Sequence, residues 1–216
     1  MLTSIIHIPE IPRLKQICQS LAMLDAILMP DWGLRYFSFN NRWAPAEQMA
    51  SMRNGSGDTY HILFNQQGAI IKGFVHDSPM GRFVTETGKV WSGILDQLPD
   101  EFNAGFLDEP AFVIDETSFC VWRQYGEKQW NIGDITYQAG KDPDGSAYLL
   151  AFLEDDPIRY RDWAVSYYEI EIPLDAVKSL FRHIPLTDSL IFKINPNRPL
   201  DDLREDLAEI EYPLSQ

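Results

Sequence analysis

Four side chains between residues 58 and 77 could do chemistry together: His61, His76, Asp77 and the nearby Asp58. Imidazole and carboxylate groups are the ligands that zinc and related metals take, so this set would suit a metal-assisted hydrolase. The chain has no HExxH, HxH or CxxC motif that would give such a site a recognisable spacing. Isolated histidines are also common as partly buried or surface residues. We therefore assign no catalytic residue, no metal ligand and no cofactor from the sequence.

The segment Arg53–Asp58 (RNGSGD) comes shortly before these side chains and is dense in small polar residues. Such residues favour turns, and a solvated turn would account for the composition. Alternatively, the two glycines let backbone N–H groups converge in a binding loop. The spacing fits neither a Walker loop nor a dinucleotide fingerprint. Our predicted binding residues are Arg53, Asn54, Ser56, Asp58, His61, His76 and Asp77.

A β-hairpin must position these residues. Thr59–Phe64 and Ala69–Val75 are rich in β-branched and aromatic residues, and a polar, glycine-containing loop joins them. If Phe64 pairs with Ala69, one face is mostly apolar and should point into a core. The other face is mixed, and we expect it to be covered over only part of its surface; it carries His61, Leu63, Ile70, Lys72 and Phe74, with His76 at the strand's end.

The remaining pattern predicts an α+β fold with an N-terminal helix, a central, mostly antiparallel sheet and C-terminal helices packed on it. We expect one domain over 1–216, β-rich over about 34–138 and helical over about 146–212. Predicted β-region elements are strands at 34–39, 118–123, 129–132 and 135–138, an extended run at 111–114, a short helix at 90–98 and a further turn of helix at 101–107. Predicted helices are 12–28, 146–153 capped by Ser146, and three or four more beginning near Pro157, Pro173, Thr187 and Pro199. Residues 44–53 fit either a helix or an extended arm.

Two other motifs fail on inspection. Asp142–Ser146 (DPDGS) is similar to a calcium loop, but its glycine is at the fourth place and no glutamate stands at the twelfth. Cys120 lies in the middle of a predicted strand, a poor place for a reactive thiol, and there is no GxSxG motif.

Composition narrows the class of partner. The net charge of −14 argues against nucleic-acid binding and against docking on an anionic membrane, and it permits a basic protein partner. Two cysteines in 216 residues fit buried thiols in a reducing compartment. Residues 1–15 lack the pattern of a signal peptide, and no stretch approaches a membrane helix. We therefore expect a cytoplasmic protein, and we leave its oligomeric state open.

Several runs resemble an uncharacterised family of bacterial proteins: YFSFNNRW (36–43), MASMRNGSGD (49–58), IKGFVHDSP (71–79), PAF (110–112), FCVWR (119–123) and LDDLREDLAEIEYP (200–213). The resemblance covers most of the chain and implies no activity or catalytic residues. The acidic α+β character is also similar to bacterial immunity proteins, although no motif supports that analogy.

Three hypotheses follow. The leading one is a non-catalytic protein, in one form immunity-like, that binds another protein through loop 53–58 and the surface around His61 and His76. The second is a hydrolase, in one form metal-assisted, that uses His61, His76 and Asp77. The third is a structural homo-oligomer subunit.

Overall fold

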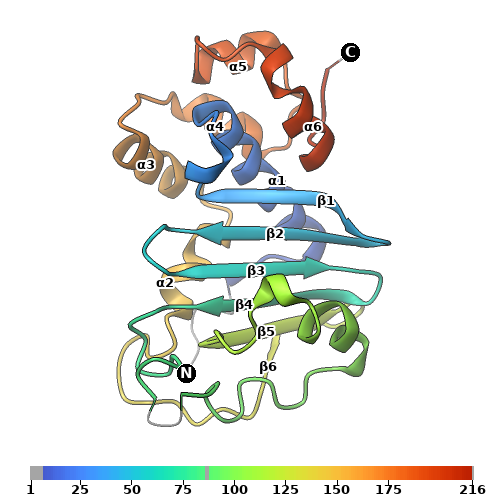
Figure 1. Cartoon of the computed structure of the whole chain (residues 1–216). Helices are drawn as coiled ribbons and strands as arrows, with labels where there is room; N and C mark the ends of the chain where they lie inside the picture. The colour runs from blue at the N-terminus through green and yellow to red at the C-terminus, as the bar shows by residue number, and fades with distance from the viewer. Residues whose placement is uncertain (1–6, 86–87, 216) are drawn as a thin grey trace.

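The fold is built on a six-stranded antiparallel sheet whose strands follow one another in chain order (Figure 1). The computed structural model describes residues 7–85 and 88–215. We expect no signal peptide in residues 1–15, and the first six of these lie outside the described residues. The strands are β1 (Phe37–Ala44), β2 (Glu47–Arg53), β3 (Thr59–Phe64), β4 (Gly68–Phe74), β5 (Phe119–Gln124) and β6 (Asn131–Ile132). The predicted α+β class, with its helices before and after the sheet, is confirmed.

The register of the central hairpin is the one we expected. Phe64 pairs with Ala69, and Ile62 pairs with Ile71. Residues 44–53, which the sequence left open, are extended, because they form the end of β1, a tight turn at Pro45–Ala46 and the whole of β2.

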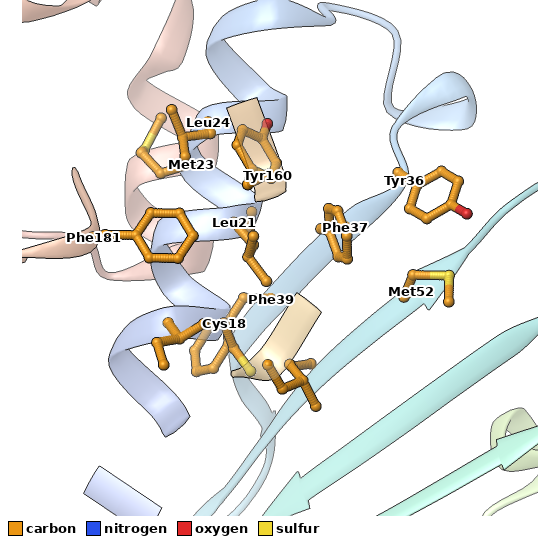
Figure 2. Close-up of a cluster of buried hydrophobic side chains, with 14 of the residues drawn as sticks. Cys18, Leu21, Met23, Leu24, Tyr36, Phe37, Phe39, Met52, Tyr160 and Phe181 are labelled. Carbon is orange, nitrogen blue, oxygen red and sulfur yellow. The ribbon is translucent and has the colours of Figure 1, made fainter. Parts of the chain in front are cut away.

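One face of the sheet packs against helix α1 (Ile11–Leu28), and this helix is buried along most of its length. The other side of α1 contacts the C-terminal helices. For this reason the burial of α1 extends past the predicted apolar stripe to residues on its other faces. Figure 2 shows part of this cluster, in which Leu21 of α1 lies toward Phe37 and Phe39 of β1. The covering helices are α3 (Pro157–Tyr168), α4 (Leu174–Phe181), α5 (Asp188–Ile194) and α6 (Arg204–Ile210). One core therefore joins the β-rich and the helical parts of the chain.

The segment between β4 and β5 covers part of the opposite face and forms a second core (Figure 1). It contains three short helical turns, η3 (Asp100–Phe102), η4 (Asn103–Leu107) and η5 (Pro110–Phe112). Their phenylalanines 102, 106 and 112 are fully buried against Leu63, Ile70 and Trp122. We expected this face to be covered only in part, but Leu63, Ile70, Lys72 and Phe74 are all buried.

Three predicted elements in the β-rich part are wrong. Residues 90–98 form successive turns because Gly93 and Gln97 adopt positive φ values of 92° and 64°, which a helix does not allow. Residues 111–114 turn instead of extending, since the Glu109 carboxylate accepts the Ala111 N–H and begins η5. Residues 135–138 are irregular, and β6 ends at Ile132.

The helical part differs from prediction mainly at its caps. Ser146 lies inside α2 (Ser146–Leu150) and does not cap it, because Gly145 occupies the cap position. Asp156 caps α3 and Thr187 caps α5 through their side-chain oxygens. The last predicted helix is split into η7 (Leu200–Leu203) and α6.

Among the described helices, none combines the length and the apolar character that crossing a bilayer requires.

Candidate functional site

The predicted binding residues Asn54, Asp58 and His76 meet at one end of the sheet, at the turn between β2 and β3. Asp58 Oδ1 accepts a hydrogen bond from the backbone N–H of His76 at 3.0 Å and lies 2.7 Å from His76 Nδ1. Its Oδ2 accepts from Asn54 Nδ2 at 2.7 Å. One carboxylate therefore ties the loop to the residues that follow β4.

The loop itself is held by its own side chains. Asn54 Oδ1 accepts the backbone N–H groups of Ser56 and Asp58 at 2.8 and 3.1 Å, which is an Asx-type turn. Gly55 and Gly57 have φ values of 73° and 109°, a region that favours glycine. The loop is thus a turn, as its composition indicates, and it is also an ordered platform for Asp58.

The two partners of the Asp58–His76 pair differ in exposure. The Asp58 side chain is 9% exposed, and the His76 side chain is 47% exposed. The hydrogen bond that the His76 ring donates to Asp58 raises the pKa of His76 above its ordinary value, and the charges of Asp58 and Asp77 act in the same direction. Within the described residues, Nε2 of His76 makes no hydrogen bond, so the outer nitrogen of an oriented ring faces solvent.

His76 borders a hollow of about 490 Å³. The hollow is lined by Asp58, Val75, His76, Asp77, Ser78, Pro79, Asp142, Gly145 and Tyr148. Three of these side chains are carboxylates, and the set includes no lysine or arginine. The potential in the hollow is therefore negative while His76 is neutral.

The wall opposite the loop is the start of α2. Asp142 accepts the backbone N–H groups of Ala147 and Tyr148, both at 3.0 Å, and so fixes where the helix begins. Tyr148 is 49% exposed and lies in the hollow's lining. Burial raises the pKa of Tyr36, and its hydrogen bond to the Tyr148 side chain and the charge of Asp58 act in the same direction. A second tyrosine therefore lies close to the carboxylate.

Two predicted binding residues lie elsewhere. The Arg53 guanidinium donates to the Trp32 carbonyl at 2.5 Å and lies over the Trp32 ring at 3.8 Å from its centroid. His61 faces the second core, where its ring lies 5.3 Å from that of Phe112. Ser56 and Asp77 stay near the site, Ser56 through its N–H bond to Asn54 and Asp77 through the hollow.

His61 belongs to a row of polar residues that crosses the sheet in register. The row runs from Ser38 through Ser51, His61 and Lys72 to Cys120. Burial lowers the pKa of His61 to about 3, and the charge of Lys72 adds to this, so the ring is neutral at pH 7. His76 follows Lys72 by four residues, or about 13 Å of extended chain, which separates it from His61.

The metal-assisted hypothesis needs His61 and His76 at one centre, and the structure separates them. Across the described residues, no three His, Cys, Asp or Glu side chains are grouped so that they could hold a metal ion. In the DPDGS segment, Asp144 Oδ1 makes local hydrogen bonds: it accepts from both the backbone N–H and the hydroxyl of Ser146.

Sequence reasoning missed Asp142 and Tyr148 as site residues. We tested Asp142 only as a calcium ligand, and it precedes the first residue of α2 by four positions, outside the N-cap position that a sequence pattern would identify. Nothing in the local sequence indicated Tyr148, because α2 and loop 53–58 are about ninety residues apart and meet only in the fold.

We compared the chain with protein-family models, curated proteins and solved structures, and none of them matches it. The resemblance to a bacterial family stays a prediction.

Proposed function

We propose that this protein acts by binding a basic segment of another protein in the hollow beside loop 53–58. The observation that carries the proposal is the lining of the hollow, in which Asp58, Asp77 and Asp142 surround an open space without any lysine or arginine side chain. An arginine or lysine of the partner would supply the missing charge.

The aromatic wall supports the same class of partner. A guanidinium or ammonium group is attracted to the face of a tyrosine ring, and Tyr148 offers such a ring at half exposure. The net charge of −14 would steer a basic partner toward the protein before contact. Because Asp58 is held by Asn54 and His76, its position is set before the partner arrives.

Binding of an acetylated and amidated tetra-arginine peptide, measured by calorimetry at low salt, tests the proposal. The variant D77N removes a charge from the hollow without removing any hydrogen bond within the described residues. Because exposed ion pairs contribute up to about 1 kcal/mol, we expect D77N to weaken binding up to about fivefold. The tetra-citrulline analogue, which keeps the shape and loses the charge, should not bind.

The variant D115N is the matched control. Asp115 is exposed in the loop before β5, outside the hollow, and its substitution lowers the general negative charge by the same amount. Equal weakening by D77N and D115N would mean that the peptide senses only net charge, and the assigned hollow would then be wrong. Peptide-induced NMR shifts should map to residues 54–58, 76–79 and 142–148.

The Asp58–His76 hydrogen bond favours a second candidate function, hydrolysis with His76 as general base. Asp58 orients the ring through Nδ1 and leaves Nε2 free to take a proton from a water molecule. Ser78 is not positioned as the nucleophile, since its hydroxyl donates to the Pro143 carbonyl at 2.8 Å.

A panel of p-nitrophenyl acetate, butyrate and phosphate esters tests the second candidate. The hydrolase would show a rate that falls as pH drops through the raised pKa of His76 and that is lost in H76Q. The variant H7Q, which changes another exposed histidine, should keep the rate. Hydrolysis no faster than buffer for all three esters would exclude this function for these substrate classes.

A further inference from the structure

A second and larger concavity lies at the opposite end of the strands. It has a volume of about 970 Å³, within the range of small-molecule sites. In an antiparallel sheet of this order, the β1–β2, β3–β4 and β5–β6 turns all fall at one end, and these turns contribute Ala46, Asn65 and Tyr125 to the groove. The first two turns of α1 form the other wall. Figure 1 shows the β1–β2 turn on the side away from α2 and the β2–β3 turn.

Cationic side chains face this groove from both walls. Lys15 projects from α1 and Arg42 from β1, and neither side chain makes a hydrogen bond or ion pair within the described residues. Burial lowers the pKa of Lys15, and the charges of Arg13 and Lys15 add to burial in lowering the pKa of His183, which also lines the groove. The groove therefore carries two cationic side chains, Lys15 and Arg42, and the charge of Glu211 also acts on Lys15.

The one acidic side chain in the groove lining, Glu47, lies against Gly105 of η4. A Cβ atom added at Gly105 would lie 2.3 Å from Glu47 Oε1, so this carboxylate packs against the Gly105 backbone. Burial raises the pKa of Glu47, and the charge of Glu109 adds to the rise, which favours the neutral form. The Glu47 carboxylate therefore lies on the Gly105 side of the groove.

Amide side chains make up much of the remaining surface. They are Gln16, Gln19, Asn41, Gln48, Asn65 and Gln66. Five of them already make one or more hydrogen bonds. Gln48 Nε2 donates to Asn41 Oδ1 at 2.9 Å, and Gln19 Nε2 donates to the Ile210 carbonyl at 2.9 Å. Asn65 Oδ1 accepts the backbone N–H groups of Gln67 and Gly68, and Gln16 Oε1 accepts from Arg13. An amide offers both donors and an acceptor, which matches a ligand rich in hydroxyl groups.

We propose that this groove binds an acidic saccharide, with its carboxylate toward Lys15 and Arg42 and a sugar ring against Tyr125. The Tyr125 ring is 56% exposed at the groove margin and presents an apolar face for the C–H groups of a sugar. The hydroxyl groups pair with the amides. This site is separate from the acidic hollow and does not depend on the function proposed there.

An acidic peptide fits the same charges less well. Extended peptides bind mainly by adding a strand to a sheet edge, and this groove is walled largely by turns and a helix. The groove lining also includes apolar side chains, among them Ile11, Trp43 and Phe64, so the choice between the two occupants rests on the geometry of the walls.

Calorimetric titration with trigalacturonate tests the proposal, with maltotriose as the neutral comparator and a triglutamate peptide as the alternative occupant. We expect trigalacturonate to bind and maltotriose to bind at least about tenfold more weakly, since a hydrogen bond to a charged group contributes a factor of this order or more. Triglutamate keeps the carboxylates but has no sugar ring for Tyr125 and no hydroxyl groups for the amides, so it should also bind more weakly than trigalacturonate. The variants K15Q and Y125A should each weaken trigalacturonate binding, K15Q by about tenfold. K141Q, which removes an exposed lysine outside the groove, should leave it unchanged.

Four results would overturn the proposal: no trigalacturonate binding at millimolar concentration, equal binding of maltotriose, tighter binding of triglutamate, or unchanged affinity in K15Q. Because Lys15 and Tyr125 make no hydrogen bond through their side chains within the described residues, both variants should fold. Circular dichroism of each variant checks that the fold is intact before titration.

Discussion

Replacing Asp25 with asparagine should change how the free energy of unfolding depends on pH between pH 4 and pH 7. Asp25 is completely buried in α1, and its carboxylate joins three elements. Oδ2 accepts the backbone N–H groups of Tyr36 and Phe37 at 2.9 and 2.8 Å, and Oδ1 accepts the Tyr160 hydroxyl at 2.7 Å. Asparagine has the same shape and keeps one acceptor for the two N–H groups, so D25N should preserve the packing.

The magnitude follows from the pKa of Asp25. Burial raises this pKa from 3.8 to about 6, and the hydrogen bonds from Phe37, Tyr160 and Tyr36 oppose the rise. Between these two values the native state holds a proton that the unfolded state has lost. The stabilising contribution is therefore complete below pH 3.8 and is lost as pH rises through 6. A shift of this size corresponds to about 3 kcal/mol, of which about 2 kcal/mol falls between pH 4 and pH 7.

Urea denaturation of the wild type and D25N at half-unit pH steps measures this effect. The free energy of unfolding of the wild type minus that of D25N should fall by about 2 kcal/mol from pH 4 to pH 7. Taking the difference cancels the titration of the other carboxylates, which are common to both proteins. A difference that is flat, or that rises with pH, would show that Asp25 stays ionised in the native state and would refute the reasoning.

Three further changes are expected to alter stability, each measured by chemical denaturation. Burial lowers the pKa of Lys72 from 10.5 to about 8. The free energy of unfolding of the wild type minus that of K72M should therefore rise by about 1–2 kcal/mol from pH 8 to pH 9.5, and a flat difference would contradict this. G73A should destabilise the protein by about 1–3 kcal/mol, because the new Cβ would lie 2.1 Å from the Phe119 ring; no loss would mean that the ring moves freely. V113G should stabilise it by about 1 kcal/mol, since Val113 has a φ of 43°; a loss would mean that the valine side chain contributes packing.

The sequence predicted the fold class because its strongest local patterns agree with the final packing. The apolar stripe from Leu14 to Leu28 forms a helix, and the 59–75 hairpin has the expected register, since the loop length and the alternation of side chains both specify it. Prediction failed at 90–98 and 111–114, where side-chain caps and positive φ values override periodicity. A cap or a positive φ value depends on a single residue, so it leaves little trace in the spacing of apolar residues from which the elements were predicted.

The candidate sites divide in the same way. Local sequence determined that 53–58 is a polar turn with Asp58 at its end, because Asn, Gly and Asp favour that geometry within a few residues. Three features became visible only in the fold. Asp58 contacts His76 and lines one hollow with Tyr148. His61 lies against a core, and three turns that are distant in sequence line a groove together with Lys15. The physical reason is that strand register and helix packing place residues that are far apart in the chain, and these depend on the apolar surface buried by the whole fold.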